Sequence, residues 1–135
     1  MAQTLEEFIA DFALFEDWEG RFAYLIDLGK ALPPLDDSYK TDEFLVRGCT
    51  SKVWLVADRK GDSLHFDADS DAFIVKGLIA LLLAAYNGKS AQEILTTDIE
   101  GAFRQMGLEN HLSPNRRNGF FAMVGKMRDY AASAS

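Results

Sequence analysis

Cysteine is nearly absent from this chain of 135 residues, in which Cys49 is the only one. A single thiol cannot close an intrachain disulfide, so small disulfide-stapled folds and sites built from paired cysteines are excluded. Histidine is also scarce, and His65 and His111 stand at no spacing typical of metal ligands. We therefore expect a protein of a reducing, cytoplasmic compartment that carries no metal and no other cofactor.

Basic residues are also in short supply, with 14 Lys and Arg against 21 Asp and Glu and a formal net charge of −7. A net negative charge disfavours binding to the phosphate backbone of a nucleic acid.

The N-terminal "MAQTLEEFIADF" lacks the basic and apolar regions of a signal peptide. The most apolar stretch, residues 72–86, contains Lys76 and falls short of the roughly 20 residues that a membrane-spanning helix needs. We expect no nucleic-acid or membrane partner and interpret this stretch as a core helix.

What the sequence does contain is the composition of a globular protein, with 48% hydrophobic and 26% charged residues. The length fits one domain by the usual prior of roughly 100 to 200 residues per domain. We expect a single domain over residues 1–135.

Helices are predicted where a capping residue precedes apolar residues at helical spacing. The start signals are the capping boxes Thr4–Glu7, Ser90–Glu93 and Thr97–Glu100, then Ser70 or Asp71 before residue 72, and Ser113 before Pro114. Another helix begins near Trp18 and is expected to end at Gly29 and "LPPL", residues 32–35, because proline lacks an amide donor. The apolar helix should stop at residues 87 and 88, and Gly77 within it could permit close packing against a neighbour.

Between these helices the hydrophobic pattern changes to alternation. Residues 44–47, 51–58 and 63–69 are predicted strands, with a turn at 59–62. In the last strand one face carries leucine, phenylalanine and alanine, whereas His65, Asp67 and Asp69 form the other, which we expect to be wet. The order of helices, strands and helices predicts an α+β fold, a small antiparallel sheet with helices packed on one face.

Cys49 lies in "RGCTS", between two of the predicted strands, where Gly48 allows a sharp turn. A free cysteine is often a buried filler, but a loop on a rigid scaffold is also a common place for a reactive group. Arg47 and Lys52 could lower the pKa of the thiol. A drop from about 8.5 to about 7 would give a net rate gain of only about three-fold, so positioning against a partner's sulfur must supply any useful rate.

Arg116 and Arg117 form a second candidate, because two arginines at a helix start oppose the helix dipole. They either contact a carboxylate, on a partner or elsewhere in the fold, or are simply solvated.

Three stretches together resemble the SufE/CsdE family of sulfur acceptor proteins, which work with cysteine desulfurases in iron–sulfur cluster assembly. They are "GCTSKVW" at 48–54, "SDAFIVKGLIALL" at 70–82 and "HLSPNRRNG" at 111–119, and the "LPPL" turn also fits. The likeness runs from about Leu5 to Ala131. It implies an α+β fold similar to that of the U-type iron–sulfur scaffolds.

The resemblance further implies that Cys49 takes sulfur from the persulfide of a pyridoxal-phosphate-dependent desulfurase and passes it to a downstream iron–sulfur scaffold. Arg116, Gly48, Ser51 and Asp71 would bind the partner or support the loop. Such a protein is a sulfur carrier and desulfurase activator rather than a stand-alone enzyme, and a homodimer is left open. The alternatives are a cluster or metal assembly scaffold, for which one cysteine is too few, and a non-catalytic adaptor. If the thiol carries persulfide sulfur, we expect it to point toward apolar neighbours when the protein is alone.

Overall fold

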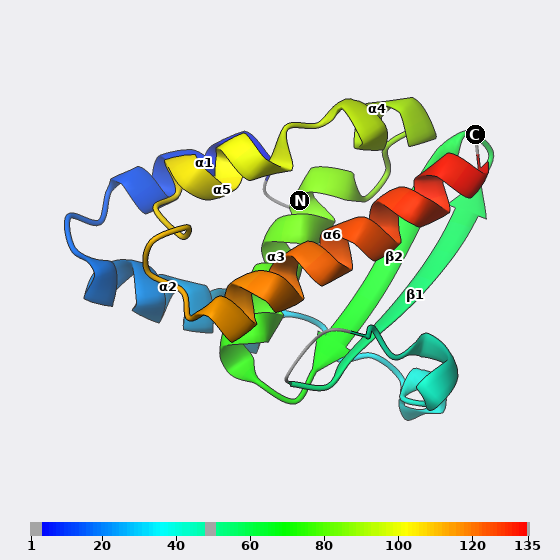
Figure 1. The fold of residues 1–135 in the computed structure, drawn as a ribbon, viewed down its shortest axis with the longest axis horizontal. Helices are drawn as coiled ribbons and strands as arrows, with labels where there is room; N and C mark the ends of the chain where they lie inside the picture. The colour runs from blue at the N-terminus through cyan, green and yellow to red at the C-terminus, as the bar shows by residue number, and fades with distance from the viewer. Residues whose placement is uncertain (1–3, 48–50, 135) are drawn as a thin grey trace.

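The computed structural model describes residues 4–47 and 51–134 (Figure 1). Within these residues, two helices and two 3₁₀ turns precede a strand pair, and four helices follow it. The elements in order are α1 Leu5–Ala13, α2 Trp18–Ala31, the 3₁₀ turns η1 Asp37–Tyr39 and η2 Asp42–Phe44, β1 Val53–Lys60, β2 Ser63–Ser70, α3 Phe73–Tyr86, α4 Ala91–Thr96, α5 Ile99–Gln105 and α6 Pro114–Ala134.

The sheet is an antiparallel hairpin, in which β1 pairs with β2 from Val53–Ser70 to Lys60–Ser63. Gly61 turns the chain with a positive φ of 61°, which glycine adopts without strain. One face is buried beneath α6, where the Phe66 and Tyr130 rings meet edge to face at 5.9 Å. Figure 1 shows α6 crossing the molecule in front of α3, with its C-terminal end beside the tip of the hairpin. The predicted α+β architecture with a small antiparallel sheet is confirmed.

The predicted strand at residues 44–47 is wrong. The chain forms the turn η2, and among the described residues it then meets β1 through an isolated bridge between Leu45 and Trp54 and a 2.8 Å hydrogen bond from the Val46 amide to the Val53 carbonyl. Phe44 packs instead against Tyr39 at 5.4 Å. The apolar residues of this stretch are thus used for local packing and a single bridge rather than for a ladder.

Close packing between α2 and α3 explains two glycines. A Cβ on Gly77 would overlap the Leu25 carbonyl oxygen, and one on Gly29 would overlap the Phe73 carbonyl oxygen. Gly77 therefore has the packing role that the sequence predicted. The helix α2 was expected to end at Gly29 and the LPPL stretch, and it does end at that stretch: it continues past Gly29 to Ala31, with Leu32, next to the two prolines, as its C-cap.

The predicted helix starts are partly right. The capping boxes of α1 and α4 are present, and the Ser113 hydroxyl accepts a 3.3 Å hydrogen bond from the Arg116 amide at the start of α6. The N-cap of α5 is Asp98 rather than Thr97, since the Asp98 carboxylate accepts the Gly101 amide at 3.0 Å. The prediction of a Thr97–Glu100 box is wrong by one residue.

The start of α3 also differs from the prediction. Its N-cap is Ala72, which offers no side-chain hydrogen bond, so neither Ser70 nor Asp71 occupies the cap position. The Ser70 hydroxyl still accepts the Ala72 amide at 3.3 Å, and Asp71 contacts the flank of a neighbouring loop instead. The helix ends at Asn87 as predicted and supplies much of the core through Leu78, Ile79, Leu81 and Leu82, all fully buried. In the described part of the chain, no helix is long and apolar enough to cross a membrane.

Candidate functional site

A cavity of about 350 Å³ opens beside the start of β1. Its wall combines three segments that are far apart in the sequence and that the fold brings together. The lining residues are Ser51 and Val53 at the start of β1, Val75 and Leu78 of α3, and Ser113, Asn115, Arg116, Gly119 and Phe120 at the start of α6. The apolar side chains come from the core, and the polar ones lie on the β1 flank and at the helix start.

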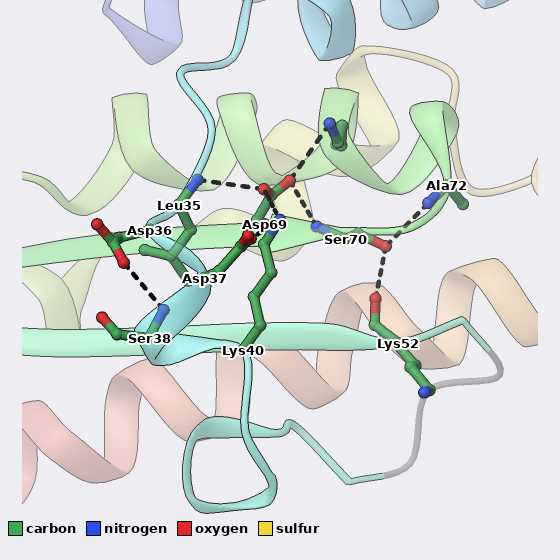
Figure 2. A network of polar contacts seen from close by, with 10 residues as sticks. Leu35, Asp36, Asp37, Ser38, Lys40, Lys52, Asp69, Ser70 and Ala72 are labelled. Carbon is green, nitrogen blue, oxygen red and sulfur yellow. Dashed lines mark hydrogen bonds and ion pairs between the residues drawn. The ribbon is translucent and has the colours of Figure 1, made fainter.

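Residues 51 and 52, the C-terminal flank of the segment 48–50, are held by several hydrogen bonds. The Ser70 hydroxyl donates a 2.7 Å hydrogen bond to the Lys52 carbonyl (Figure 2). The Lys52 amide donates to the Asp71 carboxylate at 3.2 Å. The Asp71 amide also donates to the Lys52 carbonyl at 3.3 Å. These bonds place Ser51, the first described residue of this flank, in the cavity wall. Asp71 thus supports the flank, whereas Gly48 and Cys49 lie outside the described residues, and the expected orientation of the thiol remains a prediction.

The two predicted arginines have different surroundings. The Arg117 guanidinium donates to the Glu109 carbonyl at 2.9 Å and ties α6 to the preceding loop. Arg116 lines the cavity and is exposed, with its guanidinium 5.8 Å from the centre of the Phe22 ring. Among residues 4–47 and 51–134 no carboxylate forms an ion pair with Arg116. Its charge is therefore available to a partner, whereas Arg117 is used within the fold.

Neither histidine lines this cavity. The His111 ring is exposed and stacks on Trp18 at 4.7 Å, and His65 is half-buried on β2. Within the described ranges, no group of three or more metal-ligating side chains is found. The histidines are thus not brought to the candidate site.

Asp69 is the residue whose role the sequence pattern missed. Predicted on the wet face of the sheet, it is only 1% exposed, because the segment that follows α2 covers it. Its carboxylate accepts the amides of Ser70 at 2.8 Å and Leu35 at 3.2 Å, and it pairs with the ammonium groups of Lys40 and Lys76, each at 3.4 Å. Burial would raise the pKa of Asp69, but these hydrogen bonds and charges lower it below the ordinary value. The carboxylate is therefore ionised at neutral pH.

Residues 6–131 match the family model described as "SufE: Fe-S metabolism associated domain". An uncharacterised SufE-like protein of Rhizobium etli is 46% identical over 132 residues, which cover 95% of this chain and 89% of the relative. One from Rhizobium meliloti is 42% identical over 132 residues, with 95% and 94% covered.

A solved structure shares the fold. The solution structure of a hypothetical protein from Thermus thermophilus superposes with a TM-score of 0.77 at 23% sequence identity, over 96% of this chain and 94% of that one. At this identity the likeness concerns the fold alone. It agrees with the helices and the two-stranded antiparallel sheet found here.

Proposed function

The chain belongs to the SufE family, whose domain is associated with Fe–S metabolism, and on that premise we propose that it accepts sulfur from a cysteine desulfurase and activates that enzyme. The observation that carries the proposal is the cavity beside Ser51, directly after the segment that contains Cys49. Apolar residues of α3 and α6 line it together with the exposed Arg116. Such a place can shield a sulfur from solvent and still face a partner protein.

The chemical step is a thiol exchange. The Cys49 thiolate attacks the outer sulfur of the desulfurase persulfide, a new S–S bond forms, and the old S–S bond breaks. The desulfurase cysteine leaves as a thiolate, and the outer sulfur keeps its proton as the end of a Cys49 persulfide. No external oxidant or reductant is needed, because one S–S bond replaces another. A downstream iron–sulfur scaffold would then take the sulfur by the same kind of exchange.

Four other residues have supporting roles in this proposal. A glycine at position 48 permits a backbone turn without steric strain, and Ser51 is one of the polar residues of the cavity wall. Asp71 fixes the flank through the Lys52 amide. Arg116 contacts a carboxylate on the desulfurase, which its exposure and its lack of an ion pair within the described residues support.

Mass spectrometry tests the proposal directly. The protein is mixed with a cysteine desulfurase, cysteine and pyridoxal phosphate, and the peptide containing Cys49 is examined for one added sulfur. We expect the sulfur on Cys49 and faster desulfurase turnover, both lost in Cys49→Ser. If the sulfur never appears there, or if Cys49→Ser stimulates turnover as well as the native protein, the proposal fails.

The neighbouring arginines provide a matched pair. Arg116→Ala is expected to raise the concentration of this protein needed for half-maximal sulfur transfer about ten-fold, a change typical of a lost interface charge contact. Arg117→Ala removes the bond to the Glu109 carbonyl and should lower stability without that shift. Equal shifts in both variants would contradict a partner-binding role for Arg116.

A further inference from the structure

The buried carboxylate of Asp69 connects the two pieces of chain that flank residues 48–50 (Figure 2). We propose that Asp69, with Lys40, is a positioning residue that fixes both flanks of the Cys49 segment. This inference rests on the proposed function, because it concerns the geometry in which Cys49 meets a desulfurase. Nothing in the composition of β2 indicates it, since alternation placed Asp69 on a wet face.

The C-terminal flank depends on Asp69 through Ser70. The Asp69 carboxylate accepts the Ser70 amide at 2.8 Å, which orients the Ser70 backbone at the end of β2. The Ser70 hydroxyl then donates to the Lys52 carbonyl at 2.7 Å. Lys52 follows Ser51 in the cavity wall, so two successive hydrogen bonds separate the carboxylate from the flank.

The N-terminal flank depends on Asp69 through Lys40. The Lys40 ammonium lies 3.4 Å from the carboxylate and 5.8 Å from the centre of the Trp54 ring on β1. From Lys40 the chain passes through η2 to the Leu45–Trp54 bridge and to the Val46 amide, which donates to the Val53 carbonyl at 2.8 Å. The ion pair between Lys40 and Asp69 therefore attaches residues 40–47, which lead into residues 48–50, to the sheet.

Lys76 provides a matched comparison, because its ammonium lies at the same 3.4 Å from the same carboxylate. Its side chain is 22% exposed and that of Lys40 is 30% exposed, so the two ammonium groups have similar access to water. Lys76 belongs to α3, however, and is not part of either flank. Removing one lysine at a time keeps one positive partner for Asp69 and detaches a different segment in each variant. Lys40→Met also removes the 3.4 Å ion pair with Asp37 and the contact with Trp54, and Lys76→Met also removes a 5.3 Å contact with the Phe73 ring.

Amide hydrogen exchange by NMR tests the attachment without any sulfur chemistry. In Lys40→Met we expect exchange at the Val46 amide to accelerate about ten-fold, with exchange at the Lys52 amide changed less than about two-fold. In Lys76→Met both amides should stay within about two-fold of the native protein. In Asp69→Asn exchange should accelerate at both the Val46 and the Lys52 amides. Exchange at amides of α1 and α5 should change only as much as the global stability does. If Lys76→Met loosens Val46 as much as Lys40→Met does, the assignment is overturned.

Sulfur transfer then tests the consequence. At saturating desulfurase and at a temperature where each variant is folded, Lys40→Met should transfer sulfur about ten-fold more slowly. Misplacing a reacting group by about an ångström can cost about a hundred-fold, and a loosened flank would misplace it for part of the time. Lys40→Arg should restore the rate, and Lys76→Met should retain it. Native-like transfer by Lys40→Met would overturn the positioning role even if the flank is loosened. If the native protein accepts no sulfur, the proposed function fails, and the exchange measurements alone decide whether Asp69 and Lys40 fix the flanks.

Discussion

Replacing Gly77 by alanine should destabilise the protein by about 2 kcal/mol. The new Cβ would overlap the Leu25 carbonyl oxygen and lie 2.9 Å from both the Leu25 carbonyl carbon and its Cγ. The main obstacle is backbone in the interior of α2, which cannot rotate aside, so α2 and α3 would have to separate. Overpacking costs about 1 to 3 kcal/mol, and a clash with backbone belongs at the upper end. Alanine returns about 1 kcal/mol through its helix propensity.

The loss is measurable as a melting temperature. Unfolding entropy of about 2.1 cal/mol/K per residue gives about 0.28 kcal/mol/K for 135 residues, so Gly77→Ala should melt about 7 °C lower. Gly125→Ala is the control, because Gly125 is an exposed glycine within α6 with no atom within 4 Å of an added Cβ. It should melt about 3 to 4 °C higher than the native protein. Thermal unfolding followed by circular dichroism distinguishes the two, and a Gly77→Ala protein as stable as Gly125→Ala would refute the close approach of the helices.

Three further predictions concern charge, capping and the cavity wall. Because the folded pKa of Asp69 lies below the ordinary 3.8, its contribution is present above that pH and disappears as the pH falls through the folded pKa. Denaturant titrations at several pH values should therefore show the stability difference between the native protein and Asp69→Asn shrinking below about pH 4, and a difference independent of pH would contradict it. Asp98→Ala should cost about 1 kcal/mol through loss of the α5 cap, whereas Glu100→Ala should stay within about 0.5 kcal/mol of the native protein in the same urea titration. The reverse order would support the Thr97–Glu100 box predicted one residue earlier. Phe120→Ala should cost about 3 to 5 kcal/mol in urea unfolding, because the ring is fully buried against Phe103 at 4.6 Å, and a loss below about 1 kcal/mol would show that the wall of the cavity readjusts.

The features that could be predicted from the sequence depend on interactions between residues close together in the chain. The capping boxes of α1 and α4 and the start of α6 at Pro114 involve residues within one helical turn, so spacing alone identifies them. Where two adjacent residues could each cap a helix, their other hydrogen bonds decide which one does. Thr97 and Asp98 can both cap a helix, but the Thr97 hydroxyl donates to the Glu93 carbonyl at 2.6 Å and leaves α5 to Asp98.

Long-range contacts explain what was missed. Asp69 follows the polar side of an alternating strand, and its burial depends on Leu35, which lies 34 residues earlier. Residues 44–47 have strand-forming side chains, but within the described part of the chain β1 offers them a single isolated bridge. At the candidate site Arg116 could be predicted from its unusual position at a helix start, and Ser51 from the family resemblance. Val75, Leu78 and Phe120 could not, because a cavity-lining apolar residue has the same pattern as any core residue.

The contact of α6 with the hairpin has a consequence for the order of folding. The Arg59 guanidinium donates to the Ala134 carbonyl at 2.8 Å across 75 residues of sequence, whereas the hairpin itself closes around Gly61. Hairpins form within about 10 μs, but joining distant segments carries a loop-closure entropy that grows with the intervening length. We therefore expect β1 and β2 to pair before α6 docks. Because α6 supplies Arg116 and Phe120, a folding intermediate would have its strands in place while the wall beside Ser51 is still missing.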